Sequence, residues 1–70
     1  MNKAAMKSAM AKHSDTQEML SEALDMTISC LNARINGHVD FRASEIVRII
    51  KRYNLSPEET KEIFFDEEAS

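Results

Sequence analysis

The stretch TQEMLSEALDMTISCLNARING, residues 16–37, decides the fold because it contains two apolar pairs with helical spacing. Leu20 and Leu24 are four positions apart, and so are Leu31 and Ile35, so each pair lies on one face of its own helix. Polar residues occupy most of the remaining positions. Helices this short are not stable alone, so their apolar faces must pack against each other or against the rest of the chain.

Threonine residues mark where these two helices begin. Thr16 can cap a helix from Gln17 to Leu24, and Thr27 can cap a second helix from Ile28 to about Asn36. In both cases the hydroxyl oxygen can accept a hydrogen bond from one of the N–H groups that the first turn leaves unpaired. The sequence therefore predicts two capped helices in direct succession.

The residues around the junction have the composition of a tight corner. Asp25 tolerates the left-handed backbone conformation that a sharp corner needs, and Met26 supplies an apolar plug. Ser21 is small, so the two helices can approach closely at that position. Gly37 follows the second helix, where positive φ is common. Two short helices joined by a turn of three or four residues form a helix-turn-helix unit.

The N-terminal segment predicts one further helix, from Lys3 to about Lys12. Met6 and Met10 are four positions apart, and we expect both methionines to fill the core. The linker that follows offers two capping boxes that would start the next helix earlier: Ser14 with Gln17, or Asp15 with Glu18.

After Gly37 the pattern predicts a loop and a fourth helix. Phe41 is expected to anchor the loop 38–42 in the core, and the helix is expected from Arg42 to Tyr53. Its apolar positions, which should face inward, are Ile46, Ile49, Ile50 and Tyr53. Its charged positions, which should face outward, are Glu45, Arg48, Lys51 and Arg52.

The clearest helix start signal in the chain is Ser56, Pro57 and Glu59. Asn54 is the expected C-cap of the preceding helix, and Ser56 can form a capping box with Glu59. This fifth helix should run to about Phe65, with Ile63 and either Phe64 or Phe65 facing inward.

The expected fold class is all-α, a compact five-helix bundle with no strand pattern. Seventy residues allow a single domain, here residues 1–65, followed by an acidic disordered tail at 66–70. A chain this small is marginally stable, which favours an all-helical layout with local contacts and is compatible with a homodimer. Cys30 is the only cysteine, so no internal disulfide can form. No apolar run reaches the roughly eighteen residues of a membrane span, and no signal peptide is recognisable, so we expect a cytoplasmic protein.

Enzyme, cofactor and metal chemistry are not expected. His13 and His38 lie in separate loops, and no second cysteine or spaced carboxylate joins them in a ligand pattern. Cys30 has no histidine close to it in sequence, and we expect a buried or half-buried side chain rather than a nucleophile. No glycine-rich phosphate loop is present. We therefore expect no small-molecule substrate.

The chain also resembles a known family. The run DMTISCLNARINGHVDF, followed by SEIVRIIKRYNLSPEETKEIFF, resembles the Cro/repressor family and in particular the small regulators of temperate phages of Gram-positive bacteria. The resemblance covers residues 14–65 and departs from the family pattern at Asp25 and Arg34. It implies a lambda-repressor-like bundle and a Cro-like transcriptional regulator that binds double-stranded operator DNA in a lysogeny switch.

In that family the second helix of the unit enters the major groove, and the first helix crosses the phosphate backbone. The resemblance thereby assigns base contacts to Thr27, Ile28, Ser29, Asn32 and Ala33. It assigns phosphate contacts to Gln17, Arg34, Asn36, His38 and Arg42. Asn32 is suited to adenine, and Ile28 is suited to a thymine methyl group.

The charge distribution keeps an alternative open. The net charge is −3, which is unfavourable for binding phosphates, although residues 1–39 are neutral and the acidic surplus lies in residues 40–70. The alternative is a modulator or antirepressor of a lysis-lysogeny switch, which would act by binding the main repressor protein. Exposed side chains at Met19, Ile28 and Cys30 would suit a protein groove better than a DNA groove.

Overall fold

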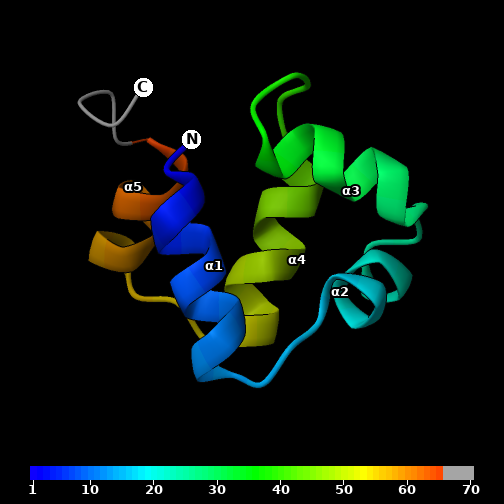
Figure 1. Cartoon of the computed structure of the whole chain (residues 1–70). Coiled ribbons are helices and arrows are strands. Elements are labelled where there is room, and N and C mark those ends of the chain that lie inside the picture. Colours follow the sequence, from blue (N-terminus) through cyan, green and yellow to red (C-terminus); the bar gives the residue numbers. More distant parts are fainter. Residues whose placement is uncertain (66–70) are drawn as a thin grey trace.

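The computed structural model describes residues 1–65, in which all regular structure is helical (Figure 1). The helices are α1 (Lys3–Lys12), α2 (Gln17–Ala23), α3 (Ile28–Ile35), α4 (Ala43–Tyr53) and α5 (Pro57–Phe64). The prediction of an all-α, five-helix bundle is confirmed, and each predicted helix end agrees within one residue. The predicted disordered tail, residues 66–70, lies outside the described residues. Within residues 1–65 no helix is long and apolar enough to cross a membrane.

The helices are arranged as two contacting pairs around a central helix. α1 contacts α5, and α2 contacts α3. In Figure 1, α4 lies between these two pairs, with α1 and α5 on one side and α2 and α3 on the other. The helix-turn-helix unit therefore lies on one side of α4, opposite the pair α1 and α5 (Figure 1).

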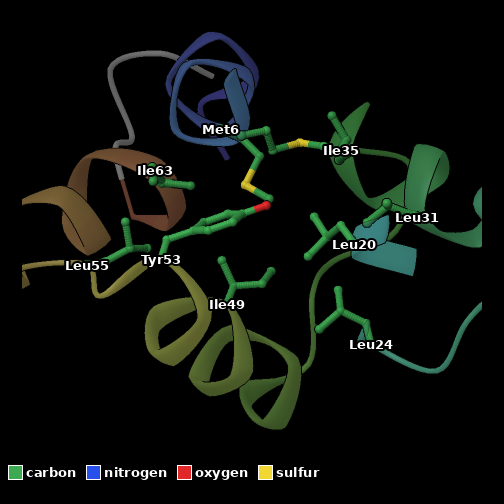
Figure 2. Packing of buried hydrophobic residues seen from close by; sticks show 10 residues of the cluster. Met6, Leu20, Leu24, Leu31, Ile35, Ile49, Tyr53, Leu55 and Ile63 are labelled. Atoms are coloured by element: carbon green, nitrogen blue, oxygen red, sulfur yellow. The ribbon is translucent and has the colours of Figure 1, made fainter. Parts of the chain in front are cut away.

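All five helices contribute to a single core (Figure 2). Its fully buried side chains are Met6, Leu20, Leu31, Ile35 and Ile49. Met10 is also buried, so the prediction that the methionines of α1 fill the core is confirmed. Because each helix has only one or two buried residues, no helix of this protein can bury its apolar face without the others.

Phe41 anchors the loop between α3 and α4, as predicted. It is half-buried against the core, and its ring meets that of Phe64 edge-on at a centroid distance of 5.7 Å. Phe65 is 60% exposed, so Phe64 is the inward phenylalanine of α5. This contact joins the loop that follows the helix-turn-helix to the C-terminal helix.

The predicted helix caps are also present. The hydroxyl of Thr16 accepts from the N–H of Met19 at 3.0 Å, and that of Thr27 accepts from the N–H of Cys30 at 3.1 Å. At α5, the Ser56 hydroxyl accepts from the N–H of Glu59 at 3.1 Å, while the Glu59 carboxylate accepts from the N–H of Ser56 at 3.0 Å. Asn54, the C-cap of α4, has φ of 50°, in the left-handed region.

The prediction of a capping box in the linker is wrong for both alternatives, Ser14 with Gln17 and Asp15 with Glu18. Thr16 is the N-cap of α2, and Asp15 is buried with its carboxylate turned toward α4. There it accepts hydrogen bonds from Arg52 and Tyr53. A guanidinium binds a carboxylate more strongly than a backbone N–H does, which explains the preference.

Candidate nucleic-acid interface

The turn between α2 and α3 has the geometry expected of a helix-turn-helix. Asp25 adopts the predicted left-handed conformation, with φ of 56°. The N–H of Met26 donates to the carbonyl of Ser21 at 3.0 Å, which folds the corner back onto α2. Ser21 is buried, and its hydroxyl donates to the carbonyl of Glu18 at 2.8 Å. A larger side chain at Ser21 would have no room in this closely packed corner.

The side of α3 opposite the core is open to solvent. Leu31 and Ile35 are buried, whereas Thr27, Ile28 and Ser29 are exposed. Asn32 and Ala33 are half-buried further along the same helix. All five residues to which the resemblance assigns base contacts thus lie on α3 or its cap, and none is withdrawn into the core.

The residues assigned to phosphate contacts fall at the two ends of the unit. Gln17 is half-buried at the start of α2, in the first turn of that helix. Asn36, His38 and Arg42 are exposed around the end of α3 and the loop that follows. Arg42 is the N-cap residue of α4, and its side chain forms no capping bond.

Arg34 differs from the other assigned phosphate contacts because it is already bound within the chain. Its Nε donates to Oε1 of Glu45 at 2.9 Å, and its Nη1 donates to the carbonyl of Cys30 at 3.3 Å. Only 14% of the Arg34 side chain is exposed. The Arg34 guanidinium therefore joins α3 to α4. For this reason Arg34 is not among the phosphate contacts of the proposed complex.

Glu45 organises the junction between α3 and α4. Oε1 of Glu45 also accepts from the N–H of Arg42 at 2.8 Å, so one oxygen binds both an arginine side chain and the start of α4. Burial raises the pKa of Glu45, but the Arg42 N–H and the Arg34 guanidinium outweigh burial and hold that pKa below its usual range. The pattern that predicts an outward Glu45 does not reveal this bond, because it joins two residues eleven positions apart.

The helix-turn-helix unit carries few cations that could meet phosphates. Its acidic residues are Glu18, Glu22 and Asp25, all exposed, and its single cation is Arg34, which Glu45 neutralises. Among the assigned contacts, Arg42 is the one arginine or lysine that forms no ion pair with residues 1–65. Any DNA binding by this face must therefore rely on hydrogen bonds and shape more than on charge.

The prediction that Cys30 is buried or half-buried is wrong, because its side chain is exposed. Cys30 precedes buried Leu31 by one position, and one position turns a helix by about 100°, away from the core. Met19 is 47% exposed and Ile28 is 43% exposed. The unit thus presents three apolar side chains to solvent, on the first turns of α2 and α3.

Metal ligands do not gather in residues 1–65: no group of three or more His, Cys, Asp or Glu side chains could hold an ion there. His13 instead stacks on the ring of Tyr53, with centroids 4.9 Å apart.

In comparisons with known proteins, no family model, curated protein or solved structure matches the chain.

Proposed function

We propose that this protein is a Cro-like transcriptional regulator that binds double-stranded operator DNA through α2 and α3. The observation that supports this proposal most strongly is the open side of α3. A capped helix whose first turn exposes Thr27, Ile28 and Ser29, beside a tight corner, suits insertion into a major groove.

In the proposed complex, the polar residues of α3 recognise base edges. The Asn32 amide can bind adenine through both its oxygen and its nitrogen, and the Ser29 hydroxyl can bind either partner of a base pair. Ile28 supplies an apolar contact for a thymine methyl group. Ala33 is small enough for the helix backbone to approach the bases closely.

Phosphate contacts in this proposal come from Gln17, Asn36, His38 and Arg42. Arg42 is the one arginine or lysine among these residues, so one or two phosphates are neutralised per chain. The logarithm of the affinity should then fall with the logarithm of salt concentration with a slope of about one to two per bound chain. A shallow slope of this kind distinguishes the protein from strongly basic DNA-binding domains.

A second candidate function is favoured by the three exposed apolar side chains Met19, Ile28 and Cys30. An apolar face with few cations is typical of a surface that enters a groove on another protein. In this alternative the protein modulates a lysis-lysogeny switch by binding its main repressor. The same helix-turn-helix face would be used, with protein instead of DNA opposite α3.

Selection from a random-sequence duplex pool tests the first candidate. Immobilised protein should enrich a common motif over successive rounds, and the enriched duplex should bind more tightly than a base-scrambled duplex of equal length. Failure to enrich any motif at low salt would contradict DNA recognition. Pull-down of a repressor from the same host by wild-type protein, but not by Ile28→Asp, would then support the second candidate.

A further inference from the structure

A groove between the end of α2 and α4 contains cations that form no ion pair within residues 1–65. The groove is lined by Ala23 and Leu24 from the end of α2 and by Arg48, Lys51 and Arg52 from α4. Arg52 is bound to Asp15. Arg48 and Lys51 are exposed and form no ion pair with any residue from 1 to 65. Within the described part of the chain, two positive charges thus lie unpaired beside the apolar residues Ala23 and Leu24.

The C-terminal part of the same sequence has the complementary character. Residues 58–68 contain six acidic residues and one basic residue. Phe65 is 60% exposed, and Asp66, Glu67 and Glu68 follow it directly in sequence. The segment 65–68 therefore combines an exposed aromatic ring with three consecutive carboxylates, which matches an apolar floor beside two cations.

Within one copy the aromatic ring of this segment lies elsewhere. Phe65 lines a separate hollow with Met1 and Val39, and this hollow shares no residue with the groove between α2 and α4. In this arrangement the groove is open to a ring from another molecule. Because the groove and the segment are different surfaces, such a contact is heterologous.

We propose that the groove between α2 and α4 binds the segment 65–68 of a second copy of this chain. The ring of Phe65 covers Ala23 and Leu24, while carboxylates of the segment pair with Arg48 and Lys51. Exposed ion pairs are individually weak and are screened by salt, so the association should be weak and salt-dependent. None of the groove residues belongs to the proposed DNA interface, so this proposal does not depend on DNA binding.

Sedimentation equilibrium of the full chain at a series of concentrations tests the association. In low salt the weight-average mass should rise above the monomer mass of 8.0 kDa with increasing concentration. In about 1 M salt, where the screening length is about 3 Å, the mass should return to that of the monomer. A monomer at every concentration and salt would overturn the proposal. Binding of the segment to the groove of its own molecule would give this same result, so that case is also excluded by the proposal.

Variants with reversed charges test whether the groove and the segment 65–68 are the two surfaces in contact. One variant carries Arg48→Glu and Lys51→Glu, and the other carries Asp66→Lys, Glu67→Lys and Glu68→Lys. Each variant alone should lose the association, because groove and segment then have the same sign. An equimolar mixture should associate again, since each variant then meets a partner of opposite charge.

Lys7→Glu is the matched control, because Lys7 is exposed on α1 and does not line the groove. This variant should associate like the wild type, and circular dichroism should show that all variants are folded. Association that survives in either charge-reversed variant would overturn the proposal. A mixture that stays monomeric would overturn it as well.

Discussion

Arg52 binds Asp15 through two hydrogen bonds that span 37 residues of sequence. Nε of Arg52 donates to Oδ2 of Asp15 at 2.9 Å, and Nη2 donates to Oδ1 at 2.7 Å. The hydroxyl of Tyr53 donates to the same carboxylate. The Asp15 side chain is only 3% exposed, so three donors satisfy a nearly buried charge. This contact fixes the linker between α1 and the helix-turn-helix to the end of α4.

The hydrogen bonds from Arg52 are the main cause of a lowered pKa of Asp15, and the bond from Tyr53 adds to it. Because the folded-state pKa lies below the unfolded value of about 3.9, the charged carboxylate stabilises the fold above that pH. This stabilisation is lost as the pH falls through the folded-state pKa. For Tyr53 the direction is opposite: burial and the neighbouring carboxylate raise the pKa of its hydroxyl, which stays protonated as a donor.

Asp15→Asn should therefore lower the stability at pH 7 by about 1.5–3 kcal/mol, since charge-assisted bonds are lost. It should also weaken the dependence of stability on pH below about 4. Urea titrations at pH 7 and pH 3 measure both effects. Glu22→Gln is the control, because Glu22 is exposed and forms no ion pair with residues 1–65. An equal loss of stability in both variants at pH 7 would show that the network contributes nothing.

Leu31→Ala should unfold the domain or nearly so. Leu31 is fully buried at the contact between α3 and the core, and removal of such a side chain typically lowers stability by about 2–5 kcal/mol. The whole stability of so small a domain is about 5 kcal/mol. Thermal melting followed by circular dichroism measures the effect. Cys30→Ala, one position away but exposed, should melt within a few degrees of the wild type.

Ser56→Ala should have a milder effect, about 1 kcal/mol, because it removes only the side-chain cap of α5. The Glu59 carboxylate can still accept from the N–H of residue 56, so half of the capping box survives. Chemical denaturation resolves a difference of this size. Ser8→Ala serves as the control, because Ser8 is exposed within α1. This substitution should change the stability by only a few tenths of a kcal/mol. Equal midpoints for Ser56→Ala and the wild type would mean that the cap is not needed.

The helices could be predicted from sequence because their signals are local. Thr16, Thr27 and Ser56 each lie three residues before the N–H group that they accept from, so the cap is readable from adjacent positions. The inward position of Leu31 follows from its spacing to Ile35. Such features depend on neighbours one or two turns away, so they can be predicted without knowing which residues pack together across the fold.

The features that sequence reasoning missed depend on distant partners. Asp15 suits a local cap in the sequence, but Arg52 comes within reach only after the linker folds against α4. Arg34 is equally ambiguous, since only the packing of α3 against α4 brings Glu45 to it. For both acids, spacing along the chain gives no information on which cation is nearest. The ion pairs around the candidate interface therefore could be found only from the structure.

Arg34→Ala separates the structural role of this arginine from a role in DNA binding. The variant should lose about 1 kcal/mol of stability, because the bond that joins α3 to α4 disappears. Its DNA binding should keep the wild-type salt slope, since the guanidinium is already neutralised by Glu45. Fluorescence anisotropy at several salt concentrations, at a temperature where the variant is folded, measures the slope. A slope smaller by about one unit would place Arg34 on a phosphate after all.

Asn32→Ala and Arg42→Ala should affect DNA binding in opposite ways. Asn32 is expected at a base edge, so its loss should lower specific affinity by about 1–3 kcal/mol while binding to scrambled DNA at low salt stays nearly constant. Arg42 is expected at a phosphate, so its loss should weaken binding to all sequences alike and reduce the salt slope by about one unit. Anisotropy with the selected and scrambled duplexes over a salt series measures the specific affinity, the affinity for scrambled DNA and the salt slope of each variant.

This contrast matters because a loss of folding would lower binding to both duplexes in both variants and could not produce opposite patterns. Asn32 is half-buried and Arg42 is exposed, and neither side chain belongs to the core, so both variants should remain folded. Ile28→Asp is the decisive companion variant, because it places a negative charge on the exposed start of α3. If Asn32→Ala and Arg42→Ala both bind DNA like the wild type, while Ile28→Asp abolishes binding to a repressor, the face recognises protein and the DNA-binding proposal is wrong.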